Sequence, residues 1–382
     1  MKLKDIGTIV TGNTPSKKNN EYYESNDILF VKPSDIEENY ITSIEKSEEY
    51  ISEKAREKAR ILPEGAVLVT CIGTIGKVGI LKQEATCNQQ INAIIPNDKV
   101  ISKYLAYLIQ SRQKILQLKA NAPVVPIINK TDFSEIEINI CDIEQQKQIV
   151  RHLDLLKSII DKRKVQIDEL QNIVKSQFVE MFGSVELNDK NFEEQEISSI
   201  ADISSSKRIY ANEYQENGVP FYRSKEIIEL GHNKKPSIEL FISAKRFEEI
   251  KERYGIPKRG DILITAVGTI GETWIVDTDN PFYYKDGNVL QIRLNTNISQ
   301  IYFKYVLDIL ISIFKSKNVS GSAYAALTIE KFKKMKIILP PIGLQNQFAE
   351  IVKQIDKQKF EIENSLKEMQ ELYESLMEKY FG

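Results

Sequence analysis

Residues 142–183 read DIEQQKQIVRHLDLLKSIIDKRKVQIDELQNIVKSQFVEMFG, and this stretch decides the predicted fold. Steps of four and three residues starting at Leu153 place apolar side chains at seven of nine positions, which is the seam of a coiled coil. Glycine and proline are absent until Gly183, and glycine commonly ends helices. About 40 residues at 1.5 Å each make a rod of roughly 60 Å. A single rod cannot bury its own stripe, so a partner helix is expected.

The same chain supplies that partner. Adding 199 to each position of the first seam gives a second seam, and it carries Gly183 onto Gly382, so that both stretches end in Phe-Gly. Gln146 and Gln148 find Gln345 and Gln347 at the same offset. Any two amphipathic helices match at heptad spacing, but that does not explain matched ends and matched glutamines. The first seam is Leu153, Leu156, Ile160, Arg163, Ile167, Leu170, Val174, Gln177 and Met181, and the second is Val352, Ile355, Lys359, Ile362, Leu366, Met369, Tyr373, Leu376 and Tyr380.

The segment before each helix has the pattern of a mixed globular domain. In the first segment, residues 28–31, 66–69, 92–96 and 134–140 are predicted strands, and residues 102–118 are a predicted helix. In the second segment, residues 219–222, 262–264 and 336–339 are the matching strands, and residues 301–305 begin the matching helix. The predicted fold class is therefore α+β: two similar globular domains, separated by two long helices that form an antiparallel coiled coil, in a pseudo-two-fold internal repeat.

Composition narrows the functional classes. The chain has 382 residues, a net charge of −2, three cysteines and two histidines. The few scattered cysteines favour a reducing cytoplasm, and no histidine has metal-ligand spacing from a cysteine. No signal peptide opens the sequence, and no apolar run reaches the length of about 18 residues typical of a membrane span. We therefore expect a cytoplasmic protein with no metal and no membrane contact.

Motifs of catalysis are missing. The stretches Gly73-Thr74-Ile75-Gly76 and Gly268-Thr269-Ile270-Gly271 lack the spacing of a phosphate-binding or dinucleotide-binding loop, and a tight turn is the preferred interpretation. Asn280-Pro281-Phe282-Tyr283 resembles an amino-methyltransferase motif but lacks the second proline and an upstream cofactor loop. No histidine lies near a serine or cysteine nucleophile. No catalytic residue is predicted.

Polar loop clusters fall at equivalent places in the two segments while their residues differ. Residues 11–20 and 88–90 carry amide and basic side chains, and residues 206–210, 222–225 and 285–288 are their counterparts. Residues 320–324, before the last strand, could lie along a nucleic-acid backbone. Arginine and lysine suit guanine edges, whereas asparagine and glutamine suit adenine edges. Each loop alone is more simply a solvated loop, but two matched scaffolds with different loops are what a bipartite DNA reader needs.

The chain resembles the specificity subunit of type I restriction-modification systems over essentially its whole length. The resemblance rests on the repeat, on the Phe-Gly ends, on Gly12-Asn13-Thr14-Pro15-Ser16, and on the sequences that lead into the long helices. There the family pattern is Pro-Leu-Pro-Pro-Leu-x-Glu-Gln. The first copy keeps Glu144-Gln145-Gln146 without the prolines, and the second keeps Pro340-Pro341 and Gln345 but has Leu344 in place of the glutamate.

The resemblance implies a function that is divided between this chain and its partners. Residues 1–141 and 184–340 would be target-recognition domains, each reading half of a split double-stranded DNA site, and helices 142–183 and 341–382 would set the spacer between the halves. Two modification subunits would carry S-adenosylmethionine and methylate adenine, a motor-nuclease subunit would complete the restriction enzyme, and this chain would hold no cofactor. The expected DNA contacts are Thr14, Ser16, Lys17, Lys18, Lys32, Thr74, Lys77, Asn88, Gln89, Gln90, Lys207, Arg208, Tyr210, Tyr222, Arg223, Lys225, Thr269, Lys285, Asn288, Ser320, Ser322 and Tyr324.

Two alternatives from other classes stay open. A coiled-coil scaffold with two protein-binding heads and no DNA role fits the nearly neutral charge, because DNA-binding domains usually carry a basic face. A stand-alone methyltransferase lacks its cofactor loop here. Salt-dependent DNA binding in the presence of modification subunits separates the scaffold from the DNA reader.

Overall fold

The computed structural model describes residues 1–120, 125–317 and 327–382. The chain divides into two compact units, each with one globular domain and half of each long helix. Unit 1 comprises residues 1–165 and 362–382, and unit 2 comprises residues 166–361. In the part of the chain that the structure describes, no helix combines the length and the apolar character needed to span a membrane.

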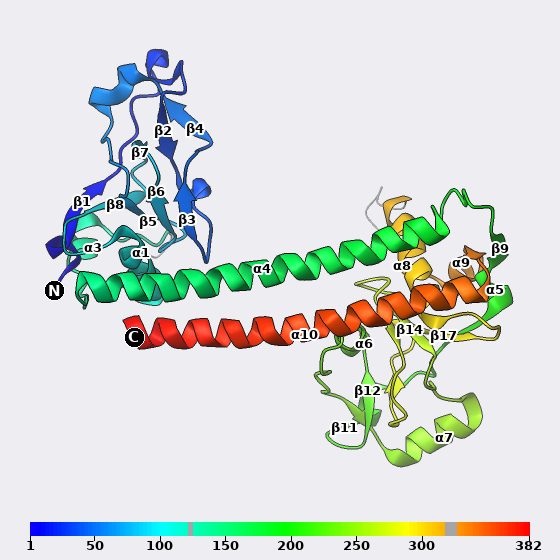
Figure 1. The fold of residues 1–382 in the computed structure, drawn as a ribbon. Helices are drawn as coiled ribbons and strands as arrows, with labels where there is room; N and C mark the ends of the chain where they lie inside the picture. The colour runs from blue at the N-terminus through cyan, green and yellow to red at the C-terminus, as the bar shows by residue number, and fades with distance from the viewer. Residues whose placement is uncertain (121–124, 318–326) are drawn as a thin grey trace. The chain divides into compact units, whose positions relative to one another are not determined.

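The two long helices are α4 (Ile143–Phe182) and α10 (Ile342–Phe381), each of 40 residues (Figure 1). Their bounds differ by the 199 residues that separate the two predicted seams, so the duplication extends to the ends of the helices. Gly183 follows α4 with a φ of +70°, a left-handed conformation that glycine adopts without a steric penalty. The two predicted helices are confirmed.

The helices pair in antiparallel fashion. In unit 1, Leu153 of α4 shares a buried cluster with Phe381 of α10, and His152 Nδ1 lies 3.2 Å from Tyr380 Oη. In unit 2, Phe178 and Phe182 near the end of α4 each contact Phe348 near the start of α10, with ring centroids 5.5 Å apart. The first half of α4 therefore packs on the second half of α10, and the reverse holds in unit 2, so the predicted antiparallel coiled coil is confirmed.

All eighteen predicted seam positions are buried or half-buried, including the polar Arg163 and Lys359. The most deeply buried side chains of the helix pair include aromatic residues that the seam prediction left out. These residues are Phe178, Phe182, Phe348 and Phe381. They lie toward the helix ends, where each helix packs on a globular domain as well as on its partner.

The globular domain of unit 1 contains two β-sheets. The five-stranded sheet has the order β1 (Gly7–Thr11), β8 (Ile91–Pro96), β5 (Val67–Thr70), β6 (Val78–Leu81), β3 (Ile41–Ile44). The three-stranded sheet has the order β4 (Glu49–Ile51), β2 (Ile28–Val31), β7 (Ala85–Cys87), with β2 and β7 parallel. The α-helices are α1 (Ser102–Ser111), α2 (Gln113–Lys119) and α3 (Lys130–Ser134), and the 3-10 helices are η1 (Leu3–Asp5), η2 (Asn20–Tyr23), η3 (Pro33–Asp35) and η4 (Glu53–Lys58).

Unit 2 repeats this plan. A four-stranded sheet, β10 (Ala201–Ser205), β17 (Val289–Leu294), β14 (Ile262–Thr265), β15 (Thr273–Ile275), matches β1-β8-β5-β6. A second sheet, β11 (Tyr214–Gln215), β13 (Phe241–Ile242), β12 (Val219–Tyr222), β16 (Tyr283–Tyr284), has β12 and β16 parallel, as β2 and β7 are. The remaining elements are β9 (Glu193–Glu196) paired with β18 (Lys336–Leu339), α5 (Ile197–Ile200), α6 (Ser224–Gly231), α7 (Ala244–Tyr254), α8 (Gln300–Lys317), α9 (Ile329–Lys333) and η5 (Ala211–Glu213).

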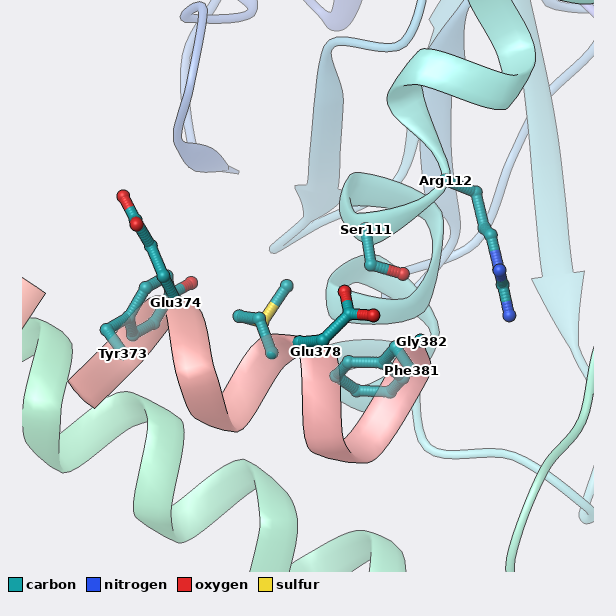
Figure 2. A pocket seen from close by; sticks show the side chains of 8 residues that line it. Ser111, Arg112, Tyr373, Glu374, Glu378, Phe381 and Gly382 are labelled. Carbon is teal, nitrogen blue, oxygen red and sulfur yellow. The ribbon is translucent and has the colours of Figure 1, made fainter. Parts of the chain in front are cut away.

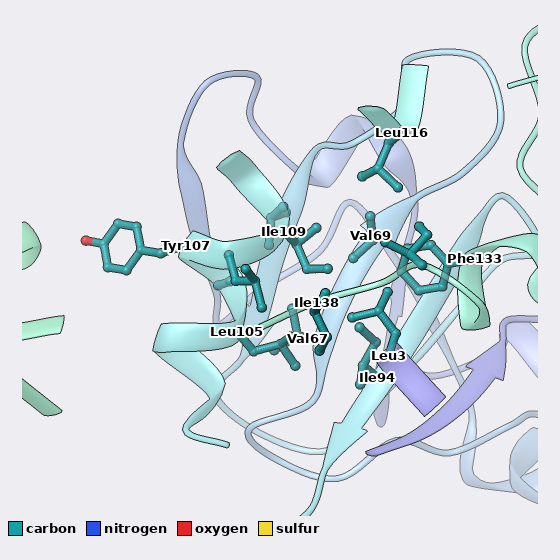
Figure 3. Close-up of a cluster of buried hydrophobic side chains, with 14 of the residues drawn as sticks. Leu3, Val67, Val69, Ile94, Leu105, Tyr107, Ile109, Leu116, Phe133 and Ile138 are labelled. Atoms are coloured by element: carbon teal, nitrogen blue, oxygen red, sulfur yellow. The ribbon is translucent and has the colours of Figure 1, made fainter. Parts of the chain in front are cut away.

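The main core of unit 1 forms between the larger sheet and the helices. Figure 3 shows Val67, Val69 and Ile94 from the sheet facing Leu105 and Ile109 of α1. Tyr107 belongs to the same buried cluster, but its ring points away from these sheet residues, and its hydroxyl donates to Asp154 Oδ1 of α4 at 2.5 Å. A second link uses Tyr40, whose hydroxyl accepts from Lys164 Nζ at 3.1 Å and whose ring lies 3.7 Å from Lys157 Nζ. These contacts attach the globular domain to the first half of α4.

Two predicted elements of the first segment differ from the structure. Residues 134–140 are not a strand: outside the named strands they make one antiparallel bridge, Lys2 with Glu137. Their counterpart β18 is a strand because β9 pairs with it, whereas in the described part of the chain the backbone of residues 134–140 is bonded across to Met1 and Leu3. The predicted helix 102–118 is split in two at Arg112, which has φ −91° and ψ 6°. The strands predicted at 28–31, 66–69, 92–96, 219–222, 262–264 and 336–339 are confirmed within one or two residues.

The two Gly-Thr-Ile-Gly stretches form tight turns, as predicted. Gly73 and Gly76 have φ of +78° and +86° between the antiparallel strands β5 and β6. Gly268 and Gly271, with φ of +79° and +88°, do the same between β14 and β15. A Cβ on Gly76 would lie 2.7 Å from Gln113 Cγ, so the turn also needs glycine for its packing against α2.

Candidate nucleic-acid interface

In unit 1, three chain segments meet where strands β1, β2 and β7 end. Because β2 and β7 are parallel, the residues that follow them emerge at the same edge of the sheet. The Asn88 backbone N–H donates to Val31 O at 3.1 Å, and the Asn13 N–H donates to Cys87 O at 2.9 Å. These bonds join residues 12–16, 32 and 88–90, which we call loop cluster 1.

Gly12 allows this close approach. A Cβ at Gly12 would lie 2.1 Å from Asn88 O and 2.3 Å from Cys87 O, distances that no side chain can occupy. Asn13 then fixes the loop: its Nδ2 donates to Lys58 O at 2.7 Å, and its Oδ1 accepts from the Arg60 N–H at 2.9 Å. Asn13 was not among the predicted site residues, although asparagine at such a turn is a recognisable signal.

The polar side chains of loop cluster 1 contact one another. Thr14 Oγ1 donates to Gln89 Oε1 at 2.8 Å, and Asn88 Nδ2 donates to Gln90 Oε1 at 2.9 Å. Asn88 is buried, whereas Gln89 is exposed. Gln89 is thus the amide that this cluster presents to solvent, with Thr14 beside it.

The cations near loop cluster 1 differ in availability. Lys32 forms an ion pair with Glu49, and the hydrogen bond from its ammonium holds the pKa of Glu49 below its usual value. Lys77 Nζ donates to Pro33 O at 3.2 Å. Lys17 and Lys18 are exposed, as is the neighbouring Ser16. Lys17 and Lys18 are therefore the cations most open to a phosphate backbone.

Unit 2 brings the equivalent segments together at the ends of β10, β12 and β16. The Lys285 N–H donates to Tyr222 O at 2.9 Å, which repeats the bond from Asn88 to Val31. The Lys207 N–H donates to Tyr283 Oη at 2.6 Å, and the Gly287 N–H donates to Ser205 Oγ at 3.0 Å. Residues 206–210, 223 and 285–288 form loop cluster 2.

Loop cluster 2 carries different chemistry at the place of Thr14 and Gln89. Arg208 Nε donates to Asp286 Oδ2 at 2.9 Å, with 66% of the Arg208 side chain exposed and 16% of the Asp286 side chain exposed. Tyr210 is also exposed, and Lys207 Nζ lies 4.8 Å from the centroid of the Tyr254 ring. Tyr254, at the end of α7, was not among the predicted contacts.

Several predicted contacts of unit 2 are engaged inside the domain. Arg223 pairs with Glu226 and Glu239, and Lys225 pairs with Glu239. Hydrogen bonds from Lys225 and Arg223 lower the pKa of Glu239 to about 2. Tyr222 is buried, and its ring stacks on Phe282 with centroids 4.9 Å apart. We therefore leave Tyr222 out of the proposed interface.

The remaining predicted contacts lie next to the two clusters or outside the described residues. Thr74 and Thr269 are exposed in the Gly-Thr-Ile-Gly turns. The strands before these turns end beside the loop clusters, because the Cys71 N–H donates to Gln90 O and the Ala266 N–H donates to Asn288 O. Ser320, Ser322 and Tyr324 fall outside the described residues.

A pocket of about 370 Å³ lies in unit 1 between the end of α1 and the last turns of α10 (Figure 2). Glu374, Glu378 and Arg112 give it polar walls, and Phe381 gives it an apolar one. None of the predicted DNA contacts line it, so this pocket is separate from loop cluster 1.

Comparison with known proteins identifies the fold. A family model described as the type I restriction modification DNA specificity domain matches residues 1–172 and again residues 189–372. The chain belongs to this family. The two matches agree with the internal duplication, and the resemblance predicted from the sequence is confirmed.

Members of the family resemble this chain along most of its length. The MjaIX specificity subunit of a type I restriction enzyme from Methanocaldococcus jannaschii is 28% identical over 376 residues, covering 92% of this chain and 85% of the relative. A type I restriction-modification S subunit from M. genitalium has the same fold, with a TM-score of 0.60 at 15% identity, covering all of this chain and 95% of the other. A chain from a study of type I complex assembly gives a TM-score of 0.59 at 17% identity, covering 100% and 96%.

Proposed function

We propose that this chain is the DNA specificity subunit of a type I restriction-modification complex. Residues 1–141 and 184–340 each read one half of a bipartite double-stranded DNA site. The observation that carries the proposal is the repeated loop cluster: the same strand ends gather Thr14 and Gln89 in one domain and Arg208 and Asp286 in the other. Equivalent scaffolds with different side chains suit the reading of two unlike half-sites.

Hydrogen-bonding side chains in both clusters support base reading in the major groove. Exposed Gln89 offers amide donors and an acceptor, and exposed Arg208 offers guanidinium donors. Lys17, Lys18 and Lys207 supply positive charge for phosphates, which position a protein on DNA without reading sequence. The remaining predicted contacts, apart from Tyr222, are kept as part of this proposal.

The helix pair sets the spacer between the half-sites. Helices of 40 residues are roughly 60 Å long, and the centres of half-sites one DNA turn apart lie about 34 Å apart. A coiled coil with a buried seam is stiff enough to hold a fixed separation, because each turn is packed against its partner. The number of unread base pairs then follows from the length of the helices.

The reaction takes place on the partners. Two modification subunits bring S-adenosylmethionine and methylate an adenine in each half-site, and a motor-nuclease subunit completes the restriction enzyme. This chain contributes binding and spacing, holds no cofactor and performs no chemical step. Its place of action is the cytoplasm, where the host DNA lies.

Methylation mapping tests the proposal. The chain is co-expressed with the modification subunit of its own system in a host that lacks other adenine methylation, and methylated adenines are mapped across the genome. We expect a split, asymmetric motif that disappears when this chain is omitted. Exchanging residues 1–141 for the corresponding domain of another family member should change one half of the motif. Loss of both halves in a folded, assembled variant, or no methylation dependent on the chain, contradicts the proposal.

A further inference from the structure

We propose that Arg208 reads a guanine in the half-site bound by residues 184–340, and that Asp286 positions its guanidinium for this contact. This inference rests on the proposed function and deepens it, because it assigns one base to one side chain. The geometry that carries it is the hydrogen bond from Arg208 Nε to Asp286 Oδ2 at 2.9 Å, together with the 66% exposure of the Arg208 side chain.

The hydrogen bond to Asp286 uses Nε and leaves the two terminal guanidinium nitrogens of Arg208 available for a base. Among the residues that the structure describes, Nε is the Arg208 nitrogen with a hydrogen-bond partner, so the terminal nitrogens Nη1 and Nη2 have none there. Guanine presents two acceptors, O6 and N7, at a spacing that matches two guanidinium N–H groups. Adenine has an N6 amino donor in place of O6, which would face the guanidinium with like polarity.

The backbone on both sides of the pair is fixed. Lys207 N–H is bonded to Tyr283 Oη at 2.6 Å, and Ile209 is buried in the domain. Asp286 lies between Lys285 and Gly287, whose N–H groups are bonded to Tyr222 O and Ser205 Oγ. A charged side chain held from both ends of its ion pair loses little further freedom on binding, which favours a specific contact.

The other arginines of loop cluster 2 and its neighbourhood lack this arrangement. Arg223 uses Nη2 on both Glu226 and Glu239. Arg246 pairs through Nε with Glu213 and through Nη1 with Glu249. Arg259 does form an Nε bond to Asp279 at 3.0 Å, but it precedes β14, whereas loop cluster 2 joins the opposite end of that strand at Ala266. Arg259 therefore offers the same pair chemistry at a different place.

Phosphate binding is the competing role for Arg208. A guanidinium that contacts phosphate weakens binding to all sequences about equally when it is removed, whereas a base contact relaxes one position of the motif. The two roles give different methylation motifs, so motif mapping separates them.

The experiment compares variants of the full chain, each purified with its modification subunits and assayed on DNA libraries randomised at the half-site. The wild-type complex should require guanine at one position. Arg208→Ala should lower the preference for guanine there by about 10-fold or more. Arg208→Lys keeps the charge but replaces the planar guanidinium fork by a flexible ammonium with no Nε for Asp286 to hold, so it should lower the preference to a smaller extent. Arg259→Ala is the matched control and should leave the motif unchanged.

The role of Asp286 is tested by comparing the guanine preference with total DNA binding. Asp286→Ala frees Arg208 to rotate and removes a negative charge, so we expect the guanine preference to fall while total DNA binding is kept or strengthened. Asp286→Asn, whose amide oxygen can still accept from Nε, should restore part of the preference. An Asp286 that served only the fold would lower binding to every sequence.

Three results overturn the inference. One is an unchanged motif in the assembled Arg208→Ala complex, another is uniform weakening across all sequences, and the third is a wild-type half-site for residues 184–340 without a guanine. In each case a wild-type split motif leaves the proposed function standing. A wild-type complex without sequence-dependent methylation removes both.

Discussion

The side-chain oxygen of Gln146 accepts a hydrogen bond from the Ile101 backbone N–H at 2.9 Å, and Gln345 repeats this contact with Ser299 at 3.0 Å. Each glutamine also donates its amide to the turn before its own helix, at Cys141 O and Pro340 O, both at 2.8 Å. Both side chains are buried. The matched glutamines therefore tie the start of a long helix to the start of α1 or α8.

Gln345→Ala should destabilise unit 2 by about 1–3 kcal/mol, because it leaves the half-buried Ser299 N–H and the buried Pro340 O without this partner. The single tryptophan, Trp274, is buried in the same unit, so its fluorescence in urea follows the unfolding of that unit. Gln347, exposed and one half-turn further along α10, is the matched control: Gln347→Ala should change stability by less than about 0.5 kcal/mol. Equal effects of the two substitutions would contradict this role of Gln345.

Asp261→Ala should cost unit 2 about 3 kcal/mol. The carboxylate is 4% exposed and accepts from Arg293 Nε and Nη2 at 2.8 and 2.6 Å and from Gln291 Nε2 at 2.7 Å. Removal of the carboxylate leaves these N–H groups of Arg293 and Gln291 without their hydrogen-bond acceptor in a partly buried environment. Asp279→Ala breaks an exposed pair with Arg259 and should cost less than about 1 kcal/mol in the same fluorescence assay. A smaller loss from Asp261→Ala than from Asp279→Ala would contradict the argument.

The Glu135 carboxylate should titrate near pH 2 in the folded chain. Hydrogen bonds from Lys2 and Lys4 stabilise its charged form and lower its pKa to about 2, from an ordinary value of 4.5. A depressed pKa stabilises the fold above pH 4.5, and this contribution disappears as the pH falls from 4.5 through about 2. Carbon NMR of the labelled carboxyl measures the midpoint. The double substitution of Lys2 and Lys4 by Met should return it toward 4.5, and a wild-type midpoint near 4.5 would show that the pairs are not formed.

The spacer should lengthen when both helices are extended together. One heptad inserted after Val165 in α4 and another before Ile362 in α10 keeps the seams in register and adds roughly 10 Å, or about three base pairs. Both half-sites should stay the same in methylation maps while the unread spacer grows. A heptad inserted in α4 alone makes the two helices unequal in length and shifts their seams out of register, so it should abolish methylation. A changed half-site after the paired insertion would argue against the helices as a spacer.

Much of the fold was predictable because its signals are local and repeated. The seam of α4 and the offset of 199 residues placed both long helices within one residue of their ends. The glycine turns followed from their flanking strands. The strand predicted at 134–140 was wrong because alternating isoleucines form a strand only where a partner strand exists, and among the described residues this stretch makes one bridge, Glu137 with Lys2.

The sequence predicted which loops carry polar side chains, but not which of these side chains contact each other or form ion pairs. Thr14 and Gln89, 75 residues apart, contact each other because the loop that follows β1 lies against the end of β7, where the Asn13 N–H donates to Cys87 O. Arg223 and Lys225 looked available in the sequence, yet both pair with Glu239, which lies on a different segment. No local pattern reports such a partner, because an ion pair depends on distance in space.

By itself, the sequence determined the duplication, the long helices and their antiparallel pairing, since helical periodicity and a repeat offset are properties of the chain in one dimension. Only the tertiary structure decided which polar side chains gather at each loop cluster and which of them remain free. That choice depends on the parallel pairing of strands that are distant in the sequence, and on carboxylates such as Asp286 and Glu239 that folding brings to particular cations.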